Sequence, residues 1–200
     1  MEIAVLTFDG YNELDSFVVA ALLNRAGLKA YITTPNAEVT SMFGVKVAGQ
    51  KPLSFASQAD AVVIGSGPGT RKVVKDPALL AQIKLDPSRQ MIVSQCSGVL
   101  ILAALGLVEA GQTVCTDLSN APRAQEAGLI VSDQPFLANR NVATAGGCLA
   151  SQYIAAWIVG RALGPQAARD VIWYAAPVGE KDAYADRALA AVGLGEMAEA

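Results

Sequence analysis

One cysteine stands where an α/β chain would hold a nucleophile. Cys96 directly follows the β-type run 90–95 and precedes Ser97 and Gly98, which begin a helical pattern. A side chain on such a tight strand-to-helix turn projects outward, and small residues after it let the helix pack close to the sheet. A helix N-terminus also favours the thiolate form of a cysteine. The spacing indicates a nucleophile elbow, and the alternative is a buried packing cysteine.

The sequence contains no histidine, and this absence decides what can assist Cys96. Ser-His-Asp and Cys-His groups, histidine-ligated zinc and imidazole base catalysis are all excluded. The acid or base must then be a carboxylate, a tyrosine, a lysine or water. Asp15 is the first candidate, because it begins a predicted helix just after the first predicted strand, and Glu13 is its rival. A carboxylate at a helix start also has a purely structural use, as a cap or a partner of the helix dipole.

A glycine-rich loop, residues 65–69, follows the apolar run 59–64. It lacks the lysine and the Ser/Thr of a phosphate-binding loop. Because glycine allows close backbone approach, the N–H groups of Gly67 and Ser97 are candidates for an oxyanion hole beside the elbow. The alternative interpretation is a simple turn between a strand and a helix.

Strands and helices must alternate to position these residues. Strands are predicted at 2–8, 29–34, 59–64 and 90–94, with shorter ones at 114–116 and 129–131 and hairpins at 39–53 and 134–144. Helices are predicted at 15–26, 77–85, 97–105, 118–127 and 149–163, followed by two more around Gly179 and an acidic tail. This order predicts an α/β fold with a doubly wound, mainly parallel sheet sandwiched by helices. The carboxyl ends of such strands share one edge, where ligands bind.

Composition narrows the class of protein. A chain of 200 residues, 52% hydrophobic and 16% charged, predicts a single domain over 1–200 and excludes disorder. A net charge of −3 with no basic run argues against nucleic-acid binding. The cysteines Cys96, Cys115 and Cys148 have no paired spacing, so we expect reduced thiols, no disulfide and no metal. No signal peptide or membrane span is apparent, so we expect a cytoplasmic protein.

Four segments together resemble the ThiJ/PfpI superfamily over about residues 1–180. They are residues 13–15 (ELD) after the first strand, 65–67 (GSG), the elbow 94–98 (SQCSG) and 144–147 (TAGG). The resemblance implies a flavodoxin-like domain, related to the class I glutamine amidotransferase fold. It also implies a homodimer, a reactive elbow cysteine and a nearby acid from the first helix. Its members include proteases or amidases, glyoxalases or deglycases, isonitrile hydratases, chaperones and domains of AraC-type regulators.

Within that superfamily the sequence is most similar to the isonitrile hydratase-like branch. The histidine that protease-like and glyoxalase-like members carry after the elbow is replaced here by Asp117. Leu14 and Asp15 match the Leu-Asp motif of the hydratase branch, whereas Ser97 replaces its usual threonine. The resemblance implies a small-molecule hydratase or hydrolase without a cofactor. Cys96 would form a thioimidate and Asp15 would be the acid, with Ser66, Asp117, Gly147 and Cys148 around the substrate.

Two other classes of function stay open at this stage. The chain could be a non-catalytic redox sensor or regulatory domain that keeps an oxidisable Cys96, or a holdase chaperone that does not need it. Glu13 or Asp117 could also share the acid role with Asp15.

Overall fold

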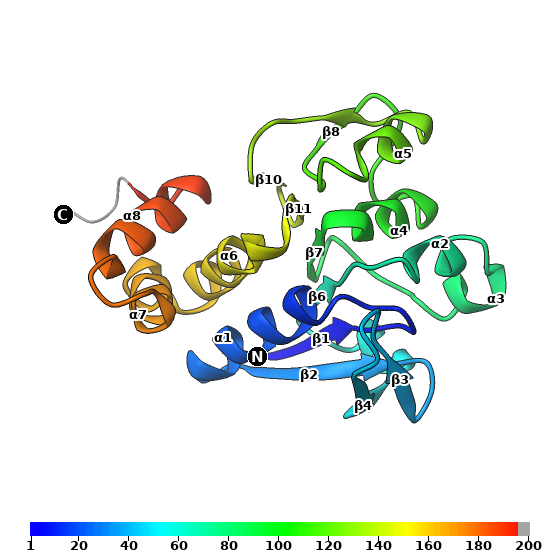
Figure 1. Cartoon of the computed structure of the whole chain (residues 1–200), viewed down its shortest axis with the longest axis horizontal. Coiled ribbons are helices and arrows are strands. Elements are labelled where there is room, and N and C mark those ends of the chain that lie inside the picture. The colour runs from blue at the N-terminus through cyan, green and yellow to red at the C-terminus, as the bar shows by residue number, and fades with distance from the viewer. Residues whose placement is uncertain (196–200) are drawn as a thin grey trace.

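A seven-stranded sheet runs through the centre of the molecule (Figure 1). The computed structural model describes residues 1–195. All neighbouring strands are parallel except β10 and β11, which form an antiparallel edge. The prediction of a doubly wound, mainly parallel α/β sheet is therefore confirmed. The strand order is β10 (Phe136–Asn139), β11 (Val142–Ala145), β7 (Met91–Gln95), β6 (Ala61–Ile64), β1 (Glu2–Leu6), β2 (Lys29–Thr34) and β5 (Lys51–Pro52).

Both faces of the sheet are buried, because successive side chains of a strand point to opposite faces. In β1, Ile3 and Val5 join one core, whereas Ala4 and Leu6 join the other. The first core is covered by α1 (Val19–Arg25), α6 (Ser151–Leu163), α7 (Pro165–Ala175) and α8 (Lys181–Ala191). The second is covered by the 3₁₀ helix η2 (Leu53–Ser57), α4 (Val99–Ala104) and α5 (Ala121–Glu126). Figure 1 shows these two helical layers on opposite sides of the sheet.

Short elements connect the layers. The predicted hairpin at 39–53 contains β3 (Glu38–Thr40) and β4 (Lys46–Ala48), and β8 (Thr113–Val114) pairs with β9 (Ile130–Val131) outside the main sheet. The helix α2 (Thr70–Val73) was not predicted, and α3 (Pro77–Leu80) is shorter than the predicted 77–85. The acidic tail lies at 196–200, outside the described residues. Within residues 1–195, no helix is long and apolar enough to cross a membrane.

Candidate active site

Cys96 lies on a sharp turn between β7 and α4. It begins the short 3₁₀ helix η3 (Cys96–Gly98) with a positive φ of 48°, a conformation that is strained for a residue with a side chain. The turn packs tightly against β6: a Cβ on Gly98 would meet the carbonyl oxygens of Ile64 and Gly65 at 2.7 and 2.8 Å. The Cys96 side chain is 4% exposed. The elbow thus holds the thiol at the carboxyl edge of the sheet and away from bulk solvent.

Asp15 reaches the same edge from the first helical segment. It lies in η1, a π-helical turn (Leu14–Val18) that leads into α1, and its side chain is fully buried. The Ser66 hydroxyl donates a 2.5 Å hydrogen bond to Oδ2 of Asp15, whereas Oδ1 has no hydrogen-bond partner among residues 1–195. A buried carboxyl with one unsatisfied oxygen is costly, and such a position is a candidate for a functional role.

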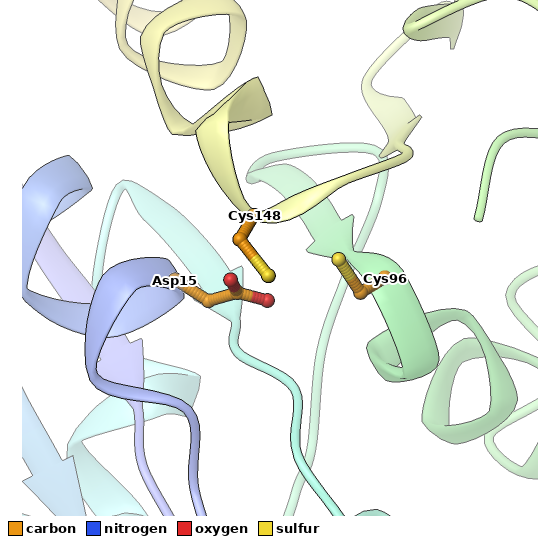
Figure 2. Close-up of side chains that lie close together, drawn as sticks. All are labelled: Asp15, Cys96 and Cys148. Carbon is orange, nitrogen blue, oxygen red and sulfur yellow. The ribbon is translucent and has the colours of Figure 1, made fainter. Parts of the chain in front are cut away.

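Asp15 and Cys96, the two candidates from the sequence, lie next to a third side chain, that of Cys148. A carboxylate oxygen of Asp15 and the sulfur atoms of Cys96 and Cys148 all lie within 4.8 Å of one another. Figure 2 shows the three side chains pointing toward a common centre from η1, from η3 and from η4 (Cys148–Ala150). Cys148 is half-buried, so this group of one carboxyl and two thiols borders accessible space.

Burial sets the protonation of this group. It raises the pKa of Asp15, an effect that the hydrogen bond from Ser66 and the two neighbouring thiols oppose. It also raises the pKa of the Cys96 thiol, and the negative charge of Asp15 raises it further. Burial and then Asp15 likewise raise the pKa of Cys148. Like charges in a buried site cannot all be present, so the three groups hold shared protons at neutral pH.

A polar network fixes the relative position of the two cysteines. The side-chain amide of Gln95 donates to the carbonyl oxygens of Gly147 and Cys148 at 3.0 and 2.7 Å. Its own oxygen accepts a 2.9 Å hydrogen bond from Ser151. Sequence reasoning gave Gln95 no role. Its position just before the nucleophile, on a strand end that must be buried, was the available signal.

Asn12 is a second residue of the site that sequence reasoning missed. Its side-chain nitrogen donates to the Cys148 sulfur at 3.1 Å. Asn12 lies in the loop after β1, at the same carboxyl edge as Asp15, so its place in the chain was the signal. A donor on this sulfur lowers the pKa of Cys148, against the larger opposing effect of burial.

The predicted oxyanion-hole residues lie side by side. The N–H of Gly67 donates to the Ser97 hydroxyl at 3.2 Å, and Thr70 contacts the same hydroxyl at 3.0 Å. Gly67 has φ 131°, and a Cβ there would fall 2.1 Å from the carbonyl oxygen of Gly10, so only glycine fits. Ser97 therefore ties the glycine-rich loop to the elbow.

A pocket of about 330 Å³ opens over this group. Ser66, Cys148 and Asp117 are among the residues that line it, whereas Gly147 is not. Two cationic side chains, Arg71 and Arg123, also line the pocket, and neither forms an ion pair with a carboxylate in the described part of the chain. The rest of the lining mixes polar and apolar groups and comes from Asn12, Met42, Gly67, Pro68, Cys96, Ser97, Ser119 and Asn120.

The alternative acids have other partners. Glu13 accepts a hydrogen bond from the Ser41 hydroxyl and is outside the group of Asp15 and the two thiols. Asp117 lines the pocket, but its carboxylate accepts hydrogen bonds from the backbone N–H and the hydroxyl of Ser119. Of the three acids, Asp15 alone belongs to the group that contains Cys96.

Comparisons with solved structures show the same fold at low identity. A ThiJ/PfpI family protein from Pseudomonas syringae is 22% identical, with a TM-score of 0.77 over 96% of this chain and 90% of that one. A DJ-1 superfamily protein from Salmonella typhimurium is 21% identical, with a TM-score of 0.76 over 87% and 97%. DJ-1 of Schizosaccharomyces pombe is 17% identical, with a TM-score of 0.73 over 86% and 96%.

No curated protein matches the sequence significantly. The sequence model of the DJ-1/PfpI family, however, matches residues 1–159. That span contains β1, the segment η1 that carries Asp15, the glycine-rich loop, the elbow and the segment that carries Cys148. The ThiJ/PfpI resemblance is thereby confirmed, and the chain belongs to the DJ-1/PfpI family.

Proposed function

We propose that the protein is a cysteine-dependent hydratase that converts an isonitrile to an N-substituted formamide. One observation carries the proposal: the buried Asp15 carboxyl lies within 4.8 Å of the Cys96 sulfur in a chain without histidine. A reaction that needs a thiol nucleophile and a proton donor, but no imidazole, matches this pair. The resemblance of residues 14–15 to the Leu-Asp motif of the hydratase branch supports the same choice.

The first step forms a carbon–sulfur bond. Cys96 attacks the terminal carbon of R–NC, and the proton that Cys96 shares with Asp15 moves to that carbon. The product is a thioimidate, R–N=CH–S, on Cys96. Because the raised pKa of Asp15 keeps the proton in the pair, the carboxyl can deliver it without a free thiolate ever accumulating.

The second step consumes water. A water molecule adds to the thioimidate carbon while Asp15, now a carboxylate, accepts one of its protons and passes it to the nitrogen, which gives R–NH–CH(OH)–S on Cys96. The carbon–sulfur bond then breaks, releasing R–NH–CHO, and the hydroxyl proton of the intermediate goes to the Cys96 and Asp15 pair. The sum is R–NC plus water to formamide, so no cofactor or redox partner is consumed.

Backbone donors assist the oxygen that develops in this second step. We propose that the N–H groups of Gly67 and Ser97 form the oxyanion hole that binds this oxygen. In the resting site the Gly67 N–H is engaged by the Ser97 hydroxyl, so the hydroxyl must rotate when substrate binds.

Arg71 and Arg123 indicate which chemical group the other end of the substrate carries. They bring two positive charges to the pocket against the single carboxylate of Asp117. An isonitrile that carries a carboxylate or a similar anionic group would pair with them, whereas a long apolar tail would leave them unpaired. We therefore favour small anionic isonitriles over lipophilic ones.

The test is direct. Purified protein is incubated with isocyanoacetate and with a neutral alkyl isonitrile, and formamide is measured by NMR. Wild type should form formamide catalytically, Cys96→Ala should form none, and Cys115→Ala should match wild type. If wild type forms none from either compound, the hydratase proposal is wrong.

The other classes of function have less support from the site. A peroxide sensor needs an accessible thiol of low pKa, but Cys96 is 4% exposed and its pKa is raised by burial and by Asp15. A holdase would not require the buried carboxyl. Peroxide oxidation at Cys96 without turnover, or suppression of aggregation by Cys96→Ala protein, would favour these alternatives.

The oligomeric state and the location of the protein are two further expectations. We expect a homodimer, which analytical ultracentrifugation would test, and a cytoplasmic location, which fractionation of the producing cell would test.

A further inference from the structure

The group formed by Asp15, Cys96 and Cys148 contains more donor atoms than the hydration mechanism uses. Cys96 and Asp15 suffice for the chemistry above, and Cys148 has no part in it. Yet all three donor atoms lie within 4.8 Å of one another (Figure 2), and the two cysteines line the pocket. Two sulfur atoms and one carboxylate oxygen are ligands that zinc accepts.

The separations suit one tetrahedral ion. With Zn–S near 2.3 Å and Zn–O near 2.0 Å, neighbouring ligand atoms in a tetrahedral site are about 3.5–3.8 Å apart. The three atoms of this group are at most 4.8 Å apart, so contraction by at most about 1.3 Å would close the site. Side-chain rotations of Cys96 and Cys148 can supply such a movement without displacing the strands.

A second and independent observation points to a ligand here. Asp15 is fully buried, its Oδ1 has no hydrogen-bond partner within residues 1–195, and Figure 2 shows its carboxyl directed at the two sulfur atoms. Neighbouring side chains also form hydrogen bonds to these candidate ligands, as they do around metal sites. Ser66 orients the carboxyl through Oδ2 and Asn12 donates to the Cys148 sulfur. Hydrogen bonds from such outer residues orient ligands and tune metal affinity.

We infer that Asp15, Cys96 and Cys148 form a binding site for one thiophilic divalent cation of the Zn²⁺ class. Binding replaces the protons of both thiols, and that of the carboxyl where it is protonated, with the ion. At least two protons are released for each ion bound. Three protein ligands leave a fourth position open toward the pocket for water or a small ligand.

The inference does not rest on the proposed hydratase activity. Because the ion would occupy both Cys96 and Asp15, metal-bound protein could not carry out the hydration described above. Bound cation would therefore act as an inhibitor of a hydratase, or as the resident ion of a site whose reaction is different. The binding measurement below gives the same answer in either case.

The test uses the full chain, reduced and free of metal, under anaerobic conditions. Co²⁺ is added in steps while absorption is followed. We expect one equivalent to bind, with thiolate-to-cobalt charge-transfer absorption and the intense visible bands of tetrahedral Co²⁺. Zn²⁺ should displace the cobalt, Mg²⁺ should not, and a pH indicator should report at least two protons released per Zn²⁺. Absence of the charge-transfer absorption at stoichiometric Co²⁺ overturns the inference.

Variants identify the ligands. Cys148→Ser should weaken Zn²⁺ binding more than about 100-fold, since losing a ligand exceeds the ~10–100-fold effect of losing an outer hydrogen bond. Ser66→Ala should show that smaller effect, and Cys115→Ser, which removes a buried thiol outside the group, should bind like wild type. Circular dichroism confirms folding, and Cys148→Ala serves as a second variant. Wild-type affinity in both Cys148 variants would contradict the assignment.

Discussion

The Ser66 hydroxyl donates a 2.5 Å hydrogen bond to Oδ2 of Asp15, and both side chains are buried. The loop that follows β6 thus orients the acid that follows β1. This hydrogen bond lowers the pKa of Asp15, but burial raises it more strongly, so the net direction is upward. One carboxyl oxygen is held in place, and the carboxyl keeps its proton more readily than an exposed aspartate does.

Asp15→Asn should abolish turnover without damaging the fold. The amide keeps an acceptor for Ser66 but cannot deliver a proton, and general acid catalysis is worth about 10²–10⁴-fold. The pKa of Asp15 is raised above its unfolded value, so ionising this carboxyl in the folded state costs stability as pH rises. Asp15→Asn should therefore unfold at a temperature equal to or above that of wild type at pH 7.

Exposed Asp133→Asn is the matched control for that experiment. It should change neither formamide production nor the melting temperature. Full activity in Asp15→Asn would remove Asp15 from the mechanism, and a large fall in its melting temperature would mean that the carboxylate is structural.

The activity should depend on pH through the proton shared by Cys96 and Asp15. The pair carries one proton between the pKa of Asp15, raised from 3.8, and that of Cys96, raised from 9.0. The rate should be flat near neutrality, fall on the acid side at a pH above 3.8, and fall on the alkaline side only at a pH above 9.0. A rate that rises through pH 6–9, as for an ordinary thiol, would contradict the shared proton.

Ser66→Ala should move the acid limb of this profile to higher pH. Removing the hydrogen bond takes away an influence that lowers the pKa of Asp15. Ser41→Ala is the control, since it removes the hydrogen bond to Glu13 and leaves the one to Asp15 in place. The Ser41→Ala profile should coincide with that of wild type. A shift of the acid limb in Ser41→Ala, with none in Ser66→Ala, would transfer the acid role to Glu13.

Gly98→Ala should destabilise the elbow. The added Cβ would meet two backbone carbonyl oxygens under 3 Å away, and backbone cannot turn aside. We expect a loss of about 1–3 kcal/mol in the free energy of unfolding, measured by denaturant titration. In Gly160→Ala the main clash is with the end of the Leu194 side chain, which can rotate. That control should be near neutral, because alanine is worth about 1 kcal/mol over glycine inside a helix.

Arg71→Gln and Arg123→Gln should each raise KM for isocyanoacetate about 3–10-fold, because each removes one charge pair that is partly screened by solvent. KM for a neutral alkyl isonitrile should not change, because the cations have no partner on that substrate. Arg187→Gln, on α8 and exposed, loses the same charge and should change neither. Equal effects of the pocket variants on both substrates would exclude an anionic substrate preference.

The alternation of strands and helices was predictable because it depends on local patterns. Continuous apolar runs such as 61–64 and 91–93 are typical of strands buried on both faces, and the structure has β6 and β7 there. Helix ends were less predictable. The segments at 15–26 and 97–105 each begin with a turn that is not α-helical, η1 and η3, where packing of Asp15 and Cys96 at the sheet edge overrides helical propensity.

The sequence by itself determined that Cys96 follows a predicted strand and that no imidazole exists, so the acid must be a carboxyl, a tyrosine, a lysine or water. Only the tertiary structure decided which groups meet that thiol. Because β11 pairs with β7 in parallel, with Ala145 opposite Gln95, the residues after the two strands emerge together and place Cys148 beside Cys96. Spacing along the chain indicated no metal ligands, since Cys148 is distant in sequence. Strand register, a non-local property, makes the two thiols and Asp15 one group.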